Sequence, residues 1–564
     1  MANEQTGTVD AAQQNDFFGH PRGLSTLFFT ELWERFSYYG MRALLVLYMT
    51  AETMTANPGL GFSVGKATAI YGLYTFFVYV LSLPGGWVAD KLWGQRKAVF
   101  VGGVIIAAGH FSMAVPWIEF FYLGLALIVI GTGLLKPNVS SMVGDLYPEG
   151  GARRDAGFSI FYMGINFGAI LGPLLCGVLG EGYNWHWGFS LAGFGMVLGL
   201  ISYKYGYKFL GNAGNLKTGE SEEVLQARSR TFYATISAVA ASIVAFTFLM
   251  SSGVINITLQ TLAEYLGGAA VAITIIFFGY IIFFGGHNKE EQKKLGVIFW
   301  LFLLAALFWS GFEQAGSSLN LFAKDLTNRN IGDIAWLDGG VALLITALIA
   351  IPILYVVYRV YKRDDLWSFA KGVVAVSSVG ILIFLWWLIQ RIGIGWETPA
   401  STLQLINPFF IVVFAPIFGF MWTWLAARNA NPSIPVKFGL GLFGLAAGFF
   451  VLSWGAANAT EANPVSPAWL VVTYFLHTAG ELCLSPVGLS SMTKLAPPSR
   501  VSQMMGIWFV AAAVGNLFAG LMAGQLEVLS ETSLFWWVAM IVGGGGVIAL
   551  IASPFVQKLM GDVE

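Results

Sequence analysis

Apolar stretches of about 20 residues recur along almost the whole chain, and they constrain its fold more than any other feature. A segment of about that length crosses the hydrocarbon core of a bilayer as a helix. Sixteen stretches qualify, so the sequence predicts an all-α polytopic membrane protein. The predicted spans are 24–52, 66–90, 97–116, 118–146, 155–180, 186–210, 230–252, 264–286, 294–323, 338–361, 369–391, 402–427, 436–455, 466–494, 502–526 and 533–557.

The composition agrees with a membrane location and narrows the possible partners. Hydrophobic residues make up 56% of the chain and charged residues 11%, against roughly 25% charged in soluble proteins. The net charge of −1 offers no basic surface for a nucleic acid. Cys176 and Cys483 lie in apolar runs, and the five histidines lack metal-ligand spacing, so we expect neither a disulfide framework nor a metal site.

Lysine and arginine residues fall mainly on one side of the predicted spans. Only four clearly fall on the other side: Lys66, Lys324, Arg329 and Arg391. The positive-inside rule makes the first side the cytoplasm and places both termini there, in a cell membrane. Residues 1–19 are polar, with no ordered signal-peptide regions, so we expect no cleaved leader.

The longest polar connector, residues 211–228, follows six predicted helices and resembles a linker between two bundles. The remaining helices include two pairs, 230–286 and 338–391, that each return the chain to the side it left. The predicted organisation is a cytoplasmic tail (1–22), an N-terminal six-helix bundle (23–210), a linker with an additional hairpin (211–292), a C-terminal six-helix bundle (293–330 and 400–564) and an inserted hairpin (331–399).

Seven ionisable residues lie inside predicted spans, where a charge costs roughly 2.5–3.5 kcal/mol and usually faces a wet cavity or a partner. They are Glu31, Glu34, Arg35, Arg42, Lys136, Glu313 and Glu481. Fully ionised, they would sum to one uncompensated negative charge. Because buried carboxyl groups take up protons rather than remain unpaired, we expect at least one of these acids to exchange a proton, which is the basis of a proton-coupling hypothesis.

Helical spacing suggests how these groups meet. Glu34 and Arg35 lie one turn from Glu31 on one face of the first span. Local salt bridges that only fix helix packing are an alternative, although these three residues leave one carboxylate over. If its helix continues through Pro137, Lys136 lies at mid-span and is a candidate partner. His477 lies one turn before Glu481, where a hydrogen bond is expected in preference to a metal pair.

The charges also suggest a ligand. Arg35 and Lys136 give the first half a positive pole, and Glu481 gives the second half a negative one. A cavity between bundles with opposite poles suits a zwitterion. Aromatic residues that could line side-chain pockets are Tyr38, Tyr39, Tyr79, Trp309 and Trp508, although most aromatics in membrane helices serve packing.

The stretch "ELWERFSYYG" resembles the ExxERFxYYG motif of the proton-dependent oligopeptide transporter (POT) family, a branch of the major facilitator superfamily. Further segments are similar to family signatures in matching order from about 24 to 526: "GGWVADKLWGQRKAV", "GTGLLKPNVSSMVGDLY", "FSIFYMGINFGAILGP", "FWSGFEQAGSSLNLFA", "LQLINPFFIVVFAP" and "GELCLSPVGLS". The resemblance implies the major facilitator fold, a twelve-helix core with alternating access. It also implies proton-coupled uptake of di- and tripeptides without a cofactor, protons being the coupling ion.

The resemblance also implies residue roles. Glu31 and Glu34 would be proton-linked carboxylates, with Arg35 their partner and a contact for the substrate carboxylate. Lys136 would pair with that motif, Glu313 would couple protonation to gating with Arg42 as its partner, and Glu481 would hold the peptide amino terminus. Tyr39, Tyr79, Asn166 and Asn407 match peptide-backbone contacts, and Trp309 and Trp508 match aromatic pocket positions. Two features depart from the family: Phe312 stands where many members have a second acid, and the pair 338–391 is additional.

Other functions remain open at this point. The same fold could carry nitrate, an amino acid or another small solute. An intramembrane enzyme would need a nucleophile such as Ser485 or Ser490 near His477, and helical spacing alone does not make a dyad. A structural or receptor-like role fits poorly with charges inside the spans. The expected partners are therefore short peptides, protons and the lipid bilayer, and the expected assembly is a monomer.

Overall fold

The computed structural model describes residues 15–149, 151–216, 221–331, 339–362, 379, 382–383, 386–387, 396–497 and 500–561. These residues are helical almost throughout. They divide into two compact units, Asn328–Pro399 and the rest of the chain. The larger unit carries the candidate site.

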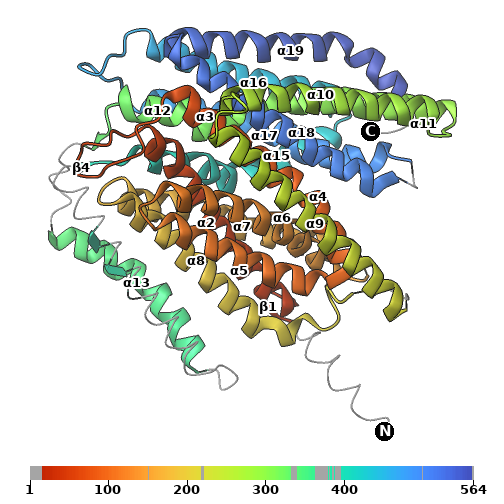
Figure 1. The fold of residues 1–564 in the computed structure, drawn as a ribbon, viewed down its shortest axis with the longest axis horizontal. Helices are drawn as coiled ribbons and strands as arrows, with labels where there is room; N and C mark the ends of the chain where they lie inside the picture. Colours follow the sequence, from red (N-terminus) through yellow and green to blue (C-terminus); the bar gives the residue numbers. More distant parts are fainter. Residues whose placement is uncertain are drawn as a thin grey trace. The chain divides into compact units, whose positions relative to one another are not determined.

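The first half of the larger unit is a bundle of six long helical segments (Figure 1). A short hairpin, β1 (Asn15–Phe17) and β2 (His20–Pro21), precedes it. The segments are α2 (Gly23–Thr50), α3 (Val64–Val80) with α4 (Ser82–Val88) and the π-helical turn η1 (Ala89–Trp93), α5 (Gln95–Met113), α6 (Ile118–Asp145), α7 (Gly151–Gly180), and α8 (Trp185–Gly206) with η2 (Tyr207–Leu210). Helix α2 packs on α7 and α8, and α6 packs on α5, α3 and α4.

The second half repeats this plan with six further segments. They are α11 (Lys289–Phe312) with η3 (Glu313–Gly316) and α12 (Ser318–Asp325), η4 (Ala400–Leu405) with α15 (Ile406–Ala426), α16 (Ile434–Ala456), α17 (Ala468–Leu495), α18 (Val501–Ala523) with η6 (Gly524–Glu527), and α19 (Glu531–Met560). Helix α16 packs on α17 and α19, and α11 packs on α18 and α19. The predicted span 294–323 is therefore broken rather than continuous, because α11 ends at the residue before Glu313.

The two halves meet through their first, second and fifth segments. Helix α3 packs on α18, α7 on η4 and α15, and α2 on η3 and α12. We call the side on which α2 ends the Thr50 face and the opposite side the Gly23 face. At the Thr50 face the halves are in direct contact, and Asn320 Nδ2 of α12 donates a hydrogen bond to Ala43 O of α2 at 2.9 Å.

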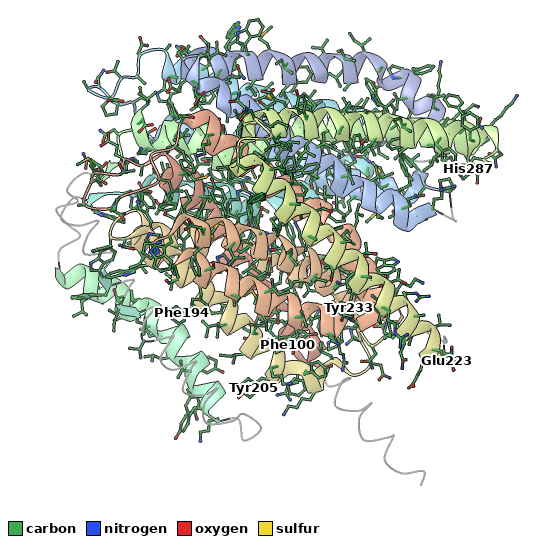
Figure 2. The ribbon with its side chains drawn as sticks, viewed as in Figure 1. Phe100, Phe194, Tyr205, Glu223, Tyr233 and His287 are labelled. Carbon is green, nitrogen blue, oxygen red and sulfur yellow. The ribbon has the colours of Figure 1, made fainter. Side chains whose placement is uncertain are left out.

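A hairpin of α9 (Glu222–Ser251) and α10 (Leu259–Phe284) connects the halves, with Glu223 and His287 near its two ends (Figure 2). Helix α10 packs on α3, α11 and α18. Helix α9 contacts the bundle near η1, where the Phe232 ring lies against the rings of Trp87 and Trp93. Its apolar side chains are otherwise exposed, as at Tyr233 (53%), which is expected of a helix that faces lipid.

The smaller unit contains β3 (Asn330–Ile331), α13 (Gly339–Tyr361) and β4 (Trp396–Glu397). The two strands pair antiparallel, and Arg329 Nη2 lies 2.7 Å from Glu397 Oε1. The predicted span 338–361 coincides with α13. The predicted span 369–391 lies mostly outside the described residues, and 379, 382–383 and 386–387 are its only parts that the structure describes.

Eleven helical segments of the described chain are long and apolar enough to cross a membrane. Most of them agree with the predicted spans to within about five residues, as at Ile118–Asp145 and Ile434–Ala456. The segment Glu222–Met250 begins well before its predicted span, 230–252. Helix α2 is not among the eleven because four charged residues interrupt it, yet it is almost wholly buried between α7 and α8. The chain is therefore a multi-pass membrane protein. The predicted domain boundaries remain predictions.

Candidate functional site

Helix α2 carries a compact cluster of three buried charges. Arg35 Nε lies 3.1 Å from Glu31 Oε1, and it also donates a hydrogen bond to Glu34 Oε2. All three residues are at most 3% exposed. Among the described residues, Glu31 Oε2, Glu34 Oε1 and Arg35 Nη2 have no hydrogen-bond partner. The cluster thus keeps unsatisfied donor and acceptor positions, together with an excess negative charge.

The backbone of α7 approaches α2 closely at this cluster. A Cβ at Gly168 would lie 2.8 Å from Arg35 Cβ and would overlap Leu32 O. One turn on, a Cβ at Gly172 would lie 2.6 Å from Phe36 O. Small residues are what allow two membrane helices to approach this far. The glycines of α7 therefore allow α2 and α7 to approach closely at the level of Arg35.

Lys136 lies in the interior of α6, which continues through Pro137 to Asp145 as the sequence predicted. Its Nζ lies 3.8 Å from the centroid of the Tyr79 ring of α3, a cation–π geometry. Within the described part of the chain, no carboxylate lies within 4.0 Å of Lys136. Its side chain is half-buried, unlike the cluster on α2. In this structure Tyr79, and not a carboxylate of α2, is therefore the immediate neighbour of Lys136.

An ion pair between α2 and the start of η3 joins the two halves. Arg42 Nη1 of α2 lies 2.9 Å from Glu313 Oε2, and both side chains are buried. Tyr71 Oη of α3 donates to the backbone carbonyl of Glu313 at 3.3 Å. The guanidinium carbon of Arg42 lies 5.5 Å from the Tyr39 ring centroid and 5.9 Å from that of Tyr71. Because Glu313 begins η3, the contact falls at the break in the helical segment.

Glu481 supplies the negative charge of the second half. Asn407 Nδ2 of α15 donates to Glu481 Oε2 at 3.4 Å and to Thr478 Oγ1 at 2.9 Å. No lysine or arginine of the described chain lies within 4.0 Å of the Glu481 carboxylate. The half-buried carboxylate is thus held by an amide and remains available to a cation.

The expected hydrogen bond between His477 and Glu481 is absent from the described contacts, and that prediction is wrong. The His477 ring turns toward α16, where its centroid lies 4.8 Å from that of Phe449. Gly448 of α16 makes room, because a Cβ there would overlap the imidazole. Among the described residues, His477 Nε2 has no hydrogen-bond partner. Close packing against α16 has overridden the one-turn spacing.

The other predicted contact residues occupy different settings. Tyr39 and Trp309 are half-buried, and no described group accepts from Trp309 Nε1. Asn166 Nδ2 donates to Tyr162 O of its own helix at 2.9 Å. The Trp508 side chain is buried inside the second half, where it packs on Phe438. The structure therefore gives Tyr39, Tyr79 and Trp309 more accessible positions than Trp508.

Two neighbours of the site were not predicted from the sequence. Tyr71 contacts Glu313 through the backbone, and Thr478 shares the Asn407 amide with Glu481. The only sequence signal is position: Tyr71 shares a helix with Tyr79, and Thr478 lies three residues before Glu481. Among the described residues, no group of three or more histidine, cysteine, aspartate or glutamate side chains could hold a metal ion.

Two helical halves around a buried, unevenly charged site define a membrane transporter of the major facilitator type. A comparison with protein families matches residues 96–371 and 386–557 to the POT family. The chain is 37% identical to the uncharacterized transporter YclF of Bacillus subtilis, over 98% of both chains. It is 35% identical to the peptide transporter YePEPT of Yersinia enterocolitica, over 97% of both. It is also 35% identical to a di-/tripeptide transporter of Lactococcus lactis, over 98% of this chain and 99% of that one.

Comparison with solved structures indicates the same family. The crystal structure of a peptide transporter POT in complex with sulfate is 36% identical, with a TM-score of 0.79, and the match covers 99% of this chain and 100% of that one. A POT family transporter in complex with 5-aminolevulinic acid is 30% identical, with the same TM-score, over 98% and 100% of the two chains. The chain belongs to the POT family, and it is a transporter rather than an enzyme.

Proposed function

We propose that this protein is a proton-coupled symporter of di- and tripeptides that works by alternating access. The observation that carries the proposal is the division of charge between the halves: Arg35 and Lys136 in the first, and Glu481 in the second without a cation within 4.0 Å among the described residues. A zwitterionic peptide matches this division. Relatives that are named as peptide transporters support it.

The peptide carboxylate would bind Arg35 and Lys136, and the amino terminus would bind Glu481. Tyr39, Tyr79, Asn166 and Asn407 would contact the peptide backbone, and Trp309 and Trp508 would line side-chain pockets. The unsatisfied Arg35 Nη2 supports the first contact, since a guanidinium donates in a fork. The Asn407 amide supports the second, because it orients the Glu481 carboxylate.

Protons would act on two groups of carboxylates. Protonation of Glu313 would remove the charge that pairs with Arg42. The ion pair between the two halves would thereby be weakened. Glu31 and Glu34 share the single Arg35, so a proton on one of them leaves a neutral cluster. Peptide and proton would load from one side, the halves would rock, and release on the other side would restore the pairs.

We further propose the cell membrane as location, with both termini in the cytoplasm, so that the Gly23 face is cytoplasmic and the Thr50 face external. The protein would be a monomer. Its domains would be the predicted tail (1–22), the N-terminal bundle (23–210), the linker with its hairpin (211–292), the C-terminal bundle (293–330 and 400–564) and the inserted hairpin (331–399). No cofactor is needed, since the proton gradient supplies the free energy. The location and orientation follow from the positive-inside rule.

The test of proton coupling is the Glu313→Gln variant in proteoliposomes. Uphill dipeptide uptake driven by an inward proton gradient should be lost, while counterflow exchange, which needs no net proton movement, should persist. Glu461→Gln is the matched control, because Glu461 is an exposed acid in the loop between α16 and α17. Concentrative uptake by Glu313→Gln would overturn the role of Glu313.

A second candidate is a proton-coupled carrier of another small solute, such as nitrate or an amino acid. One related structure contains 5-aminolevulinic acid, which supports testing solutes other than peptides. Competition of labelled dipeptide uptake by a tripeptide, nitrate and a free amino acid separates the two candidates. Competition by the tripeptide alone supports the first one.

A further inference from the structure

A glutamate of the first half caps a helix of the second half, away from the site described above. Glu181 follows the last residue of α7, at the Thr50 face. Its Oε1 accepts a hydrogen bond from Ala400 N at 2.8 Å, and its Oε2 accepts from Ser401 N at 3.0 Å and from Ser401 Oγ at 2.8 Å. Ala400 and Ser401 begin η4, so the carboxylate satisfies amide groups that a helix start leaves without partners.

The second half makes an equivalent contact with the first half. Glu527 is the last residue of η6, directly after α18. Its Oε1 accepts a hydrogen bond from Gly65 N, near the start of α3, at 2.8 Å. A Cβ at Gly65 would lie 2.7 Å from Glu527 Oε2, so a side chain at this position would displace the carboxylate. A carboxylate at a helix N-terminus is also favoured by the helix dipole.

The two contacts are reciprocal in the fold. Helices α7 and α18 are the fifth segments of their halves, and α3 and η4–α15 are the second segments. Each half therefore extends a carboxylate from the end of its fifth segment to the start of the other half's second segment. Parallel repeats of this kind are related by an axis along the membrane normal. The same type of contact therefore occurs twice, at equivalent positions of the two halves.

Both caps need the halves to be in direct contact. A Cβ at Gly177 would lie 2.6 Å from Ser401 Oγ, and a Cβ at Gly520 would lie 2.5 Å from Thr68 O. Hydrogen bonds lose most of their strength when the donor and acceptor separate by an additional ångström. A rigid-body opening at the Thr50 face therefore breaks all four hydrogen bonds together, and the caps exist only in the closed state.

We propose that Glu181 and Glu527 are positioning residues of the transport cycle, a pair of reciprocal helix caps that stabilise the state closed at the Thr50 face. The inference rests on the alternating-access function proposed above. The two residues are separate from the predicted peptide and proton sites, so they would set the ratio of closed to open states without binding the substrate. Loss of one cap should change that ratio roughly two- to thirtyfold, the range that helix-cap substitutions span.

The experiment measures the opening directly, in the full chain in lipid nanodiscs without peptide and at one pH. Spin labels are placed at Thr55 and Ala462, exposed residues in loops of the two halves at the Thr50 face. Cys176 and Cys483 are buried and need not be replaced. Pulsed electron paramagnetic resonance then gives the distance distribution for Glu181→Gln, Glu527→Gln, the double variant and the control Glu461→Gln.

Each single variant should increase the fraction of molecules in which the two spin labels are far apart, and the double variant should increase this fraction further. The control should give the same distance distribution as the unmodified protein. Unchanged distributions, or a lower melting temperature at an unchanged open fraction, would overturn the inference. If Glu181→Gln fails to fold, Ser401→Ala removes one of its hydrogen bonds and should give a smaller shift of the same sign. Because neither peptide nor a gradient is present, a failure of peptide uptake would count against the proposed function and not against the caps.

Discussion

The Arg42–Glu313 ion pair gives the sharpest quantitative prediction, through the variants Arg42→Gln, Glu313→Gln and their combination. Each single variant leaves one charge in a site where the side chains are 8% and 6% exposed. Breaking a buried pair by removing one partner costs about 3–5 kcal/mol, whereas replacing both partners is often close to neutral. The double variant should therefore be more stable than either single variant.

The expected shift in melting temperature follows from the chain length of 564 residues. With an unfolding entropy of about 2.1 cal/mol/K per residue, the whole chain gives roughly 1.2 kcal/mol/K, so each single variant should melt about 2.5–4 °C lower. The control is Glu290→Gln, which removes an exposed pair with Lys293 at 3.5 Å. An exposed pair contributes at most about 1 kcal/mol, so this control should shift by less than about 1 °C.

The assay is thermal unfolding of the purified protein in detergent, followed by intrinsic fluorescence of its tryptophans. The four proteins form a double-mutant cycle, which isolates the coupling between the two residues. A double variant as unstable as the sum of the single variants would refute the reasoning. Single variants whose melting temperatures equal that of the Glu290→Gln control would also refute the reasoning.

Three further predictions follow from the site and its packing. Gly168→Ala should destabilise the protein by about 1–3 kcal/mol, because the added Cβ overpacks against α2. The control Gly544→Ala should not destabilise it, because a Cβ there would meet nothing within 4 Å. The melting temperatures of the two variants test this prediction. Asn407→Leu should weaken competition by free dipeptides about tenfold, because Glu481 loses its hydrogen-bond donor. Competition by N-acetylated peptides should fall less, because they lack the amino group that Glu481 would bind. Removal of divalent metals with EDTA should leave uptake unaltered, because no group of metal ligands exists among the described residues. A loss of uptake that added zinc reverses would contradict this prediction.

The local features of the site could be predicted from the sequence. Helical spacing alone places Glu34 and Arg35 beside Glu31, and the stretch "VSSMVGDLY" after Pro137 is compatible with the continuation of α6. These predictions hold because they depend on contacts within one helix. The His477–Glu481 hydrogen bond depended on the same logic and failed, because Gly448 on a neighbouring helix gives the imidazole a better packed position.

Contacts between distant segments could not be derived in this way. Arg42 and Glu313 are far apart in sequence, and only the family resemblance suggested that they pair. Glu181 and Glu527 carried no signal at all, because an acid at the end of a helix is ordinary until the fold brings a helix start of the other half against it. The Asn407 donor to Glu481 likewise follows from how α15 packs on α17.

The break in the seventh core segment has a consequence for water. At Glu313 the chain leaves regular α-helix, and the carbonyl group there accepts a hydrogen bond from Tyr71 of the opposite half. The Tyr71 side chain is fully buried. A buried hydroxyl group that loses its hydrogen-bond partner costs about 1–3 kcal/mol. Separation of the halves at this level therefore favours entry of a water molecule beside the tyrosine hydroxyl, and dehydrating conditions should favour the closed state.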